Sequence, residues 1–380
     1  MVPFDFRPRT RVVFASGAIH RVGELAHELG FRKTLVVADA GVRATGYVST
    51  ALRALEVAGI AHHVFSEFGA NPDSAMVAAG AEFAAPLGVD SIIGLGGGSS
   101  LDCAKGINFV LTNGGTIADY RGYAKVTTPL LAMLGIPTTA GTGSEAQSYA
   151  VISDAGTHTK MACGDPSAAF RVAILDPELT ATAPHHVIAM SGFDAIAHAV
   201  ETAVTTRRTP LSDLFSHHAW KLLNDAYPRV LLYQGDADAR AAMMLGAHYA
   251  GMAIEQSMLG AAHACSNPLT ARFNITHGLA LGILLPHVVR WNAEAARDRY
   301  AAFLASPSRR ARDEDPGDLL ARRLEDLAAM GNLSLKLGDA GVDAAAIPEL
   351  AELAAQQWTG TFNPRPFNAE GAAEIYRAAL

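Results

Sequence analysis

The sequence has little cysteine and little charge, and both shortages narrow what the protein can be. Three cysteines, Cys103, Cys163 and Cys265, occur among 380 residues, which argues against a disulfide framework and favours a reducing compartment. Charged residues make up 18% of the chain, the net charge is −7, and no strongly basic stretch stands out, so a nucleic-acid-binding surface is not expected. No uncharged apolar run reaches the roughly 18 residues of a membrane span, and the N-terminus lacks an apolar signal core. We therefore expect a cytoplasmic protein with no nucleic-acid or membrane partner.

Apolar residues are plentiful, and their rhythm changes near the middle of the chain. The first part alternates short apolar runs with amphipathic stretches, as in a parallel sheet whose strands are buried on both faces. The predicted strands are 34–38, 63–65, 91–95, 130–136 and 172–175. After Asp176-Pro177, long Ala/Leu/His/Met-rich helical stretches dominate, such as 212–226, 239–258 and 319–337. We predict an α/β dinucleotide-binding domain at residues 1–178 and an all-α domain at residues 179–380, with the charged segment 306–318 as a surface loop.

Two loops of the first domain have the composition of a phosphate-binding site. The run Gly96-Gly97-Gly98-Ser99 follows a predicted strand and opens a predicted helix, where glycines allow close approach and free N–H groups attract an anion. The second loop, 137–145, follows another strand and offers the hydroxyls of Thr138, Thr139 and Thr142. Each pattern alone also fits an ordinary tight turn or polar loop. Two such loops at strand ends together favour a dinucleotide site.

Asp39 ends the Leu-Val-Val-Ala-Asp run and is a candidate for the adenosine ribose. A carboxylate at this position accepts hydrogen bonds from both ribose hydroxyls and repels a 2′-phosphate, which favours NAD over NADP. An exposed aspartate in a turn before Gly41 is the alternative interpretation.

Four residues in two clusters form a candidate metal site. Asp194 and His198 are four residues apart, so on a helix they project from one face. His263 and His277 follow in a second block that is also rich in small and apolar residues. With 14 histidines in the chain, chance pairs are expected, but a carboxylate in so apolar a setting needs a partner or a metal. One carboxylate and three imidazoles suit Fe(II), Zn(II) or a similar ion.

These motifs, taken together, resemble the iron-containing (group III) alcohol dehydrogenase family. The resemblance rests on Gly96 to Lys105, 137–145, 192–201, His263…His277-Gly with Leu-Leu-Pro-His287, and Asn363-Pro-Arg-Pro-Phe, which keep their order over nearly the whole chain. It implies an α/β nucleotide domain followed by a helical metal domain, the dehydroquinate synthase-like fold. It implies that Asp194, His198, His263 and His277 bind the catalytic ion, Fe(2+) or possibly Zn(2+). It implies that NAD(P) is bound by Asp39, Gly97, Gly98, Ser99, Asp102, Thr138, Thr139, Thr142 and Lys160.

The resemblance also implies a reaction, hydride transfer between a small alcohol or aldehyde and the nicotinamide, in a homodimer or larger homo-oligomer. One position departs from the family pattern: Asn267 stands where many members carry a further histidine, and an amide cannot titrate. Two alternatives stay open. A maleylacetate reductase-like enzyme needs cationic groups in its pocket, for which Arg272 is the nearest candidate, and an NAD- and metal-dependent lyase needs a multi-basic substrate site, which is not evident.

Overall fold

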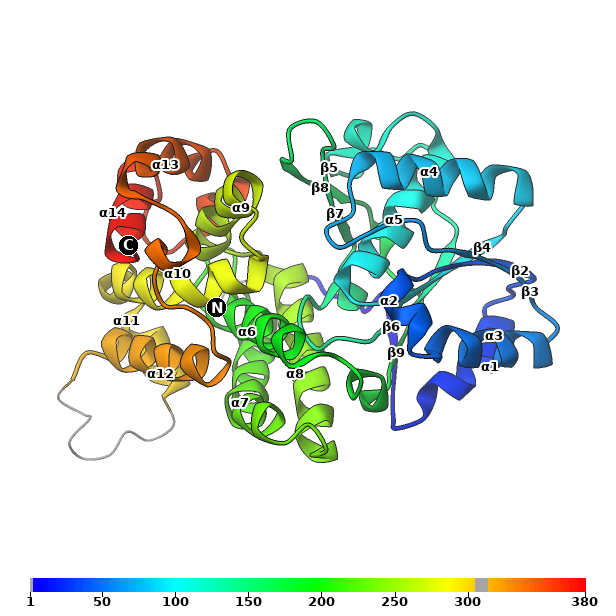
Figure 1. Cartoon of the computed structure of the whole chain (residues 1–380), viewed down its shortest axis with the longest axis horizontal. Helices are drawn as coiled ribbons and strands as arrows, with labels where there is room; N and C mark the ends of the chain where they lie inside the picture. The colour runs from blue at the N-terminus through cyan, green and yellow to red at the C-terminus, as the bar shows by residue number, and fades with distance from the viewer. Residues whose placement is uncertain (1–2, 305–313) are drawn as a thin grey trace. The chain divides into compact units, whose positions relative to one another are not determined.

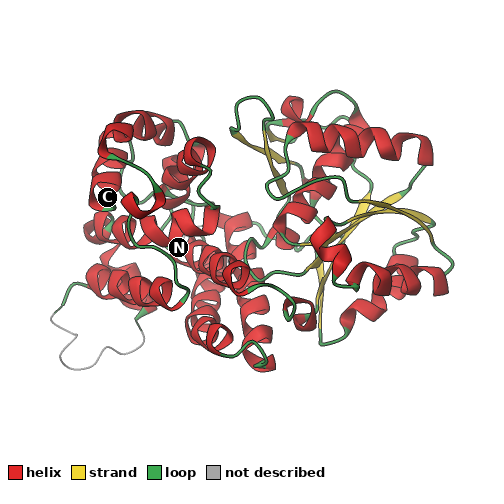
Figure 2. Cartoon of the chain, viewed as in Figure 1, coloured by secondary structure: helices red, strands yellow, loops and turns green. Residues whose placement is uncertain are grey.

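The structure is a computed structural model that describes residues 3–304 and 314–380. The chain forms two compact units, Asp5–Ala183 and Pro184–Leu380, the second also including Pro3 and Phe4 (Figure 1). The division falls between Ala183 and Pro184, five residues after the boundary at residue 178 that the sequence suggested. In the described residues, strands occur in the first unit and the second is helical, which confirms the predicted fold class (Figure 2).

The first unit is built on a six-stranded parallel sheet with the strand order β1-β9-β6-β4-β2-β3. Its strands are β1 (Arg11–Phe14), β2 (Lys33–Val37), β3 (Ala61–Phe65), β4 (Ser91–Gly96), β6 (Ala132–Pro137) and β9 (Val172–Leu175). Its helices are α1 (Val22–Glu28), α2 (Ala40–Ala44), α3 (Tyr47–Val57), α4 (Ser74–Ala84) and α5 (Gly98–Asn113), with 3-10 turns η1 (Ala18–Arg21), η2 (Ala85–Leu87), η3 (Ile117–Tyr120), η4 (Ser144–Ala146), η5 (Pro166–Ala168) and η6 (Pro177–Thr180). A smaller sheet of β5 (Gly122–Tyr123), β8 (Lys160–Gly164) and β7 (Tyr149–Ser153) completes the unit.

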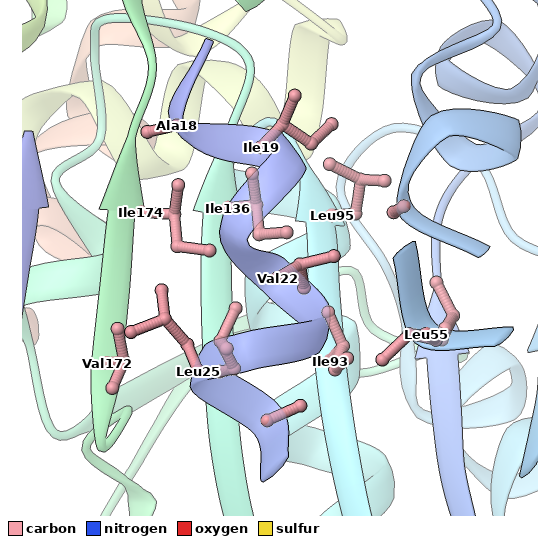
Figure 3. Close-up of a cluster of buried hydrophobic side chains, with 14 of the residues drawn as sticks. Ala18, Ile19, Val22, Leu25, Leu55, Ile93, Leu95, Ile136, Val172 and Ile174 are labelled. Atoms are coloured by element: carbon pink, nitrogen blue, oxygen red, sulfur yellow. The ribbon is translucent and has the colours of Figure 1, made fainter. Parts of the chain in front are cut away.

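Both faces of the large sheet are buried, which explains the continuous apolar runs of its strands. On one face, Ile19, Val22 and Leu25 of η1 and α1 pack against strand residues that include Ile93, Leu95, Ile136, Val172 and Ile174 (Figure 3). The alternate residues, such as Leu35, Ile92 and Met133, face a second cluster with Leu101 and Ile107 of α5. Alternation with a period of two therefore divides the central strands β2, β4 and β6 between two cores.

The strand order places the ends of β2 and β4 at the point where ligands bind in such sheets. The chain runs from β2 outward to β3, returns to β4 on the other side of β2, and continues to β6. The reversal creates a switch point at the carboxyl ends of β2 and β4. Asp39 follows β2 and Gly97 follows β4, so both lie at this edge.

The described residues of the second unit form helices joined by loops, with no strand among them. It consists of α6 (His185–Thr202), α7 (Pro210–Leu232), α8 (Ala237–Ser257), α9 (Ala261–Phe273), α10 (His277–Trp291), α11 (Ala293–Phe303), α12 (Pro316–Met330), α13 (Ile347–Ala355) and α14 (Ala369–Ala378), with 3-10 turns η8 (Gly338–Ala340), η9 (Ala344–Ala346) and η10 (Trp358–Phe362). Helix α6 packs against α7, α8 and α10, and α9 packs against α10 and α13. Asp194, His198, His263 and His277 therefore come from helices that are packed together.

Some local predictions were wrong. Strands β1, β5, β7 and β8 were not predicted. The helix expected over 319–337 ends at Met330, before Asn332 adopts a positive φ of 53°. The predicted loop 306–318 lies outside the described residues as far as residue 313, and its last three residues already belong to α12.

Candidate metal and dinucleotide sites

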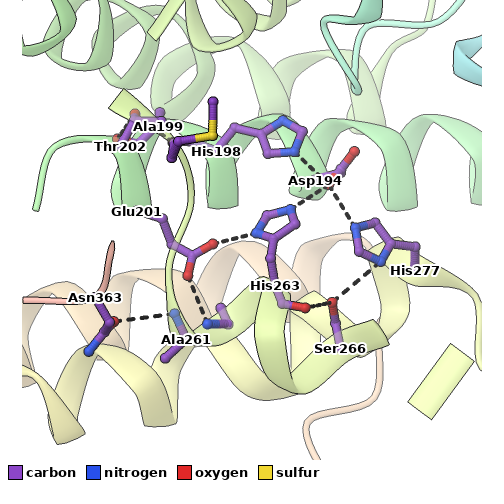
Figure 4. A network of polar contacts seen from close by, with 12 residues as sticks. Asp194, His198, Ala199, Glu201, Thr202, Ala261, His263, Ser266, His277 and Asn363 are labelled. Atoms are coloured by element: carbon purple, nitrogen blue, oxygen red, sulfur yellow. Dashed lines mark hydrogen bonds and ion pairs between the residues drawn. The ribbon is translucent and has the colours of Figure 1, made fainter. Parts of the chain in front are cut away.

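Asp194 of α6 is the centre of a buried polar cluster. Its Oδ1 lies 3.2 Å from Nε2 of His198, 3.6 Å from Nε2 of His263 and 3.7 Å from Nε2 of His277 (Figure 4). Asp194 and His198 lie one turn apart on α6, as their spacing predicted, while His263 lies in the first turn of α9 and His277 begins α10. Three elements thus bring three imidazoles to one carboxylate oxygen.

The distances within this cluster fit ligands of a shared ion better than hydrogen bonds. Charge-assisted N–H···O bonds are about 2.7–2.9 Å long, shorter than the three separations from Asp194 Oδ1. Ligand atoms that each lie about 2.0–2.2 Å from one ion are instead roughly 2.9–3.8 Å apart, which includes all three separations. Among the described residues, the buried atoms Asp194 Oδ1 and His263 Nε2 have no hydrogen-bond partner. A buried polar atom without a partner is costly, and a divalent ion would satisfy both.

The cluster strongly perturbs its own titration. Burial disfavours the charged form of Asp194, but the three imidazoles outweigh it and hold the pKa of this carboxyl well below its usual range. Burial likewise lowers the pKa of His263, but the carboxylates of Glu201 and Asp194 outweigh it and raise the pKa to about 9. The carboxylates of Asp194 and Glu201 therefore favour positive charge at this site, whether on an imidazole or on a bound cation.

Glu201, to which we assigned no role from the sequence, contacts the candidate ligand His263. Its Oε2 contacts Nδ1 of His263 at hydrogen-bonding distance, and its Oε1 accepts the N–H of Ala262 at 2.7 Å (Figure 4). A carboxylate behind a histidine fixes the tautomer and turns Nε2 toward the metal. Ser266 Oγ lies 3.4 Å from Nδ1 of His277, a weaker contact of the same kind. The available signal was the spacing: Glu201 follows Asp194 by seven residues, so it shares the same face of an apolar helix.

Asn267 lies one turn after His263 on α9. Its Nδ2 donates to Oε1 of Gln357 at 3.1 Å, so its side chain is fixed by another amide. The position therefore carries a paired carboxamide in place of a titratable imidazole.

In the first unit, the two predicted loops lie against each other. A Cβ added at Gly98 would lie 2.5 Å from a methyl group of Thr142, and one at Gly97 would lie 3.3 Å from Thr139 Oγ1. At Gly98 only glycine allows this approach, because a side chain there would overlap Thr142. Thr138 joins them through its backbone N–H, which donates to the carbonyl of Gly96 at 2.9 Å.

The remaining predicted cofactor residues surround this pair of loops. One oxygen of Asp39 accepts the N–H of Val42 and caps α2 at 3.0 Å, and the other accepts Ser100 Oγ at 3.0 Å. Ser99 Oγ accepts the N–H of Asn71 at 3.1 Å, which brings a third loop to the start of α5. Asp39 is therefore both a helix cap and a neighbour of the glycine turn.

Asp102 lies deeper, one turn into α5, and its carboxylate is occupied by the protein. It accepts Ser144 Oγ at 2.6 Å and the N–H of Val151 at 3.3 Å. Burial raises the pKa of Asp102, although the charges of Lys105 and Lys160 act in the opposite direction. Asp102 thus supports the second loop from behind, and Lys160 lies close enough to influence it.

A buried carboxylate with three imidazoles, on a chain that also carries a phosphate-type loop pair, is typical of metal-dependent oxidoreductases that use a nucleotide cofactor. Comparison with known proteins narrows this class. Residues 8–177 match the family described as iron-containing alcohol dehydrogenase, and residues 188–380 match the C-terminal part of the Fe-containing alcohol dehydrogenase family.

Individual relatives agree with this match. The chain is 35% identical to the NAD-dependent methanol dehydrogenase of Bacillus methanolicus over 289 aligned residues, and the alignment covers 76% of each chain. It is 32% identical over 382 residues to the 1,3-propanediol dehydrogenase of Citrobacter freundii, covering 99% of each. A crystal structure of a 1,3-propanediol oxidoreductase matches with a TM-score of 0.95 at 30% identity and covers 100% of both chains.

The chain belongs to the iron-containing alcohol dehydrogenase family. It is an oxidoreductase of the alcohol dehydrogenase type, as the resemblance predicted. Within residues 3–304 and 314–380, no helix is both long and apolar enough to cross a membrane.

Proposed function

We propose that the protein is an NAD-dependent alcohol dehydrogenase that also reduces the corresponding aldehyde, with Fe(2+), or alternatively Zn(2+), bound by Asp194, His198, His263 and His277. The convergence of three imidazole Nε2 atoms on one buried carboxylate oxygen carries this proposal. The family supports iron, and the NAD named for the Bacillus methanolicus relative supports NAD over NADP.

For the dinucleotide we assign the residues around the switch point of the large sheet. The contacts of Gly97 and Gly98 with the threonine loop support a phosphate-binding role for the turn that ends in Ser99 and for Thr138, Thr139 and Thr142. Asp39 is assigned to the adenosine ribose. Asp102 acts through the loop that it supports, and Lys160 of β8 completes the set.

The chemistry divides between the bound groups and the protein. When bound, the divalent ion supplies Lewis-acid polarisation of the alcohol oxygen, and the nicotinamide accepts the hydride. The protein orients the ligands: Glu201 accepts the Nδ1 proton of His263 and leaves Nε2 free to bind an ion. The amide of Asn267 is hydrogen-bonded to Gln357 and does not titrate, so it cannot accept the proton that the alcohol releases. Another group or water must accept it.

We propose a small, uncharged alcohol or aldehyde as substrate. A carboxylated substrate, as in a maleylacetate reductase, requires a cation, and Arg272 already forms a 2.6 Å ion pair with Glu349. A homodimer or larger homo-oligomer and a cytoplasmic location stay predictions.

The test is NADH formation by the full-length protein with a panel of short alcohols and diols. The protein is assayed metal-free and after addition of Fe(II) under anaerobic conditions or Zn(II). We expect NADH only with ion present, and a strong loss of both ion content and turnover in His277→Ala. His186→Ala, which removes an exposed imidazole at the start of α6, is the matched control and should behave as wild type.

Other outcomes would redirect the proposal. Full turnover in metal-free protein would exclude the proposed role of Asp194 and its imidazoles. Binding of both NAD and ion without turnover of any alcohol or aldehyde would favour the carboxylated-substrate reductase or the lyase.

A further inference from the structure

The C-terminal motif Asn363-Pro-Arg-Pro-Phe contributes one fully buried amide to the second unit. Asn363 Oδ1 accepts the N–H of Ala261 at 3.2 Å and Nδ2 of Asn292 at 3.1 Å. Its Nδ2 donates to Oδ1 of Asn292 at 2.8 Å and to the carbonyl of Arg365 at 2.7 Å. The amide therefore uses both lone pairs and both protons, which fixes its position closely.

One of these four bonds reaches the start of α9. The first N–H groups of a helix have no partner within the helix and need one from elsewhere. Gly260, which precedes α9, has no side chain to supply it. Instead, Asn363 accepts the N–H of Ala261, and Glu201 accepts the N–H of Ala262. The first turn of α9 is thus capped by two side chains that lie far away in the sequence.

Gly260 makes this arrangement possible. A Cβ added there would lie 3.0 Å from Asn363 Oδ1 and 3.0 Å from Glu201 Oε1. Both oxygens therefore occupy the space that a side chain would fill, and any residue larger than glycine would push against both caps.

His263 is the third residue of this capped turn. Its imidazole is fixed on one side by Glu201, the same carboxylate that caps Ala262 (Figure 4). The backbone that carries His263 is fixed by Asn363 as well. A shift of the turn would move Nε2 relative to Asp194 Oδ1.

We infer that Asn363 is a positioning residue of the metal site: it caps the first turn of α9 and thereby sets the place of His263. The inference rests on the proposed function, in that Asp194 and the three imidazoles bind a divalent ion. It gives the C-terminal motif a role at a site from which it is separated by about 100 residues, since Ala261 and Asn363 are 102 positions apart.

The test compares two caps of the same kind. Asn363→Ala removes the amide at α9, and Asn368→Ala removes the amide that caps α14, whose Oδ1 accepts the N–H of Gly371 at 2.9 Å. Both variants of the full-length, metal-free protein are titrated with Co(II), whose visible absorption reports on its ligand set. We expect Asn363→Ala to raise the Co(II) dissociation constant roughly 10- to 100-fold and to alter the spectrum, as does the loss of supporting contacts at other metal sites. Asn368→Ala should leave both unchanged.

A second variant and a second measurement protect the test against misfolding. Gly260→Ala keeps the amide of Asn363 but crowds both caps, so it should weaken Co(II) binding in the same way. In the metal-free protein, hydrogen exchange at the backbone amides of Ala261 and Ala262 should accelerate in Asn363→Ala and in Gly260→Ala. Equal Co(II) affinity and spectra in Asn363→Ala and Asn368→Ala would overturn the inference while leaving the ion site intact. Failure of the wild-type protein to bind Co(II) or Fe(II) would overturn the ion site itself.

Discussion

Replacing Lys105 with methionine tests how the loop behind the glycine turn is held. Lys105, on α5, is completely buried, and its Nζ donates to the carbonyls of Ser144, Gln147 and Tyr149 at 2.8, 2.9 and 2.7 Å. A fourth acceptor, Ser144 Oγ, lies at 3.0 Å. An ammonium has three protons, so four acceptors compete for them and each proton is used. Phe170 adds a cation–π contact, with Nζ 5.1 Å from the ring centroid.

The size of the effect follows from these contacts. Methionine keeps the length and the apolar stem but removes every donor, which leaves three carbonyls without this partner. Each buried acceptor that loses its partner costs about 1–3 kcal/mol, reduced where the loop relaxes or water enters. Asp102 also loses a neighbouring positive charge, which acts in the same direction. We therefore expect a loss of about 3–5 kcal/mol in the free energy of unfolding, a large part of the usual 5–15 kcal/mol.

The assay is thermal and urea unfolding of the full-length protein, followed with and without NADH. For a unit of this size, a loss of that magnitude lowers the melting temperature by about 10 °C. Lys33→Met is the matched control, because Lys33 Nζ donates to one carbonyl, that of Leu87 at 3.0 Å, and is only half-buried. It should cost about 1 kcal/mol. Equal melting temperatures for the two variants would refute the reasoning, since the four contacts of Lys105 would then contribute no more than one.

Further predictions concern the two sites and the buried thiols. Glu201→Gln presents an NH₂ group to Nδ1 of His263 and should lower the affinity for an added divalent ion roughly 10- to 100-fold, as measured by titration of the metal-free protein. Burial raises the pKa of the Cys163 thiol to about 12, so iodoacetamide at pH 8.5 should label it only after unfolding. The folded protein favours the neutral thiol of Cys163, so the free energy of unfolding should not depend on this thiol below about pH 8.5. From there to about pH 12 the unfolded chain ionises first, and the protein should lose stability. Cys163→Ala should lessen this loss, as measured by urea unfolding. Asp39→Gly should raise kcat/KM for NADP relative to NAD roughly tenfold or more, and an unchanged ratio would remove Asp39 from the ribose assignment. Asn267→His should add an ionisation near about pH 6.5 to the pH profile of kcat/KM, and a superimposable profile would contradict a role for this position in proton release.

The central strands could be predicted from sequence because their burial on two faces leaves a continuous apolar run. The edge strand β3 was predicted in part, at 63–65, but β1, β5, β7 and β8 were not. β8 has the sequence Lys-Met-Ala-Cys-Gly, without a β-branched or aromatic residue, so its strand structure comes from its pairing with β7. β7 has the sequence Tyr-Ala-Val-Ile-Ser, whose composition does favour a strand, and this signal was missed.

The clustering of the four candidate ligands could be predicted, because the pair on α6 obeys the helical period and the other two lie in a block of small residues. The groups behind them could not, because they are brought in by tertiary contacts. Glu201 meets His263 across 62 residues of sequence, and Asn363 meets Ala261 across 102. A helical period can show that Glu201 faces the same way as Asp194, but it cannot name the residue that it will meet.

The position of Glu201 also changes the charge expected at the site. Counted from the sequence, neutral imidazoles and the single carboxylate of Asp194 would leave a divalent ion with a net charge of +1. Glu201 adds a second buried carboxylate, only one imidazole away. In a buried setting an uncompensated charge is expensive, and the two carboxylates of α6 would balance the charge of a divalent ion bound beside Asp194. The seven-residue spacing that puts Asp194 and Glu201 on one face of α6 places one carboxylate on each side of His263. Alone, the two carboxylates and His263 carry a net negative charge even with the imidazole protonated, so this arrangement favours a bound cation.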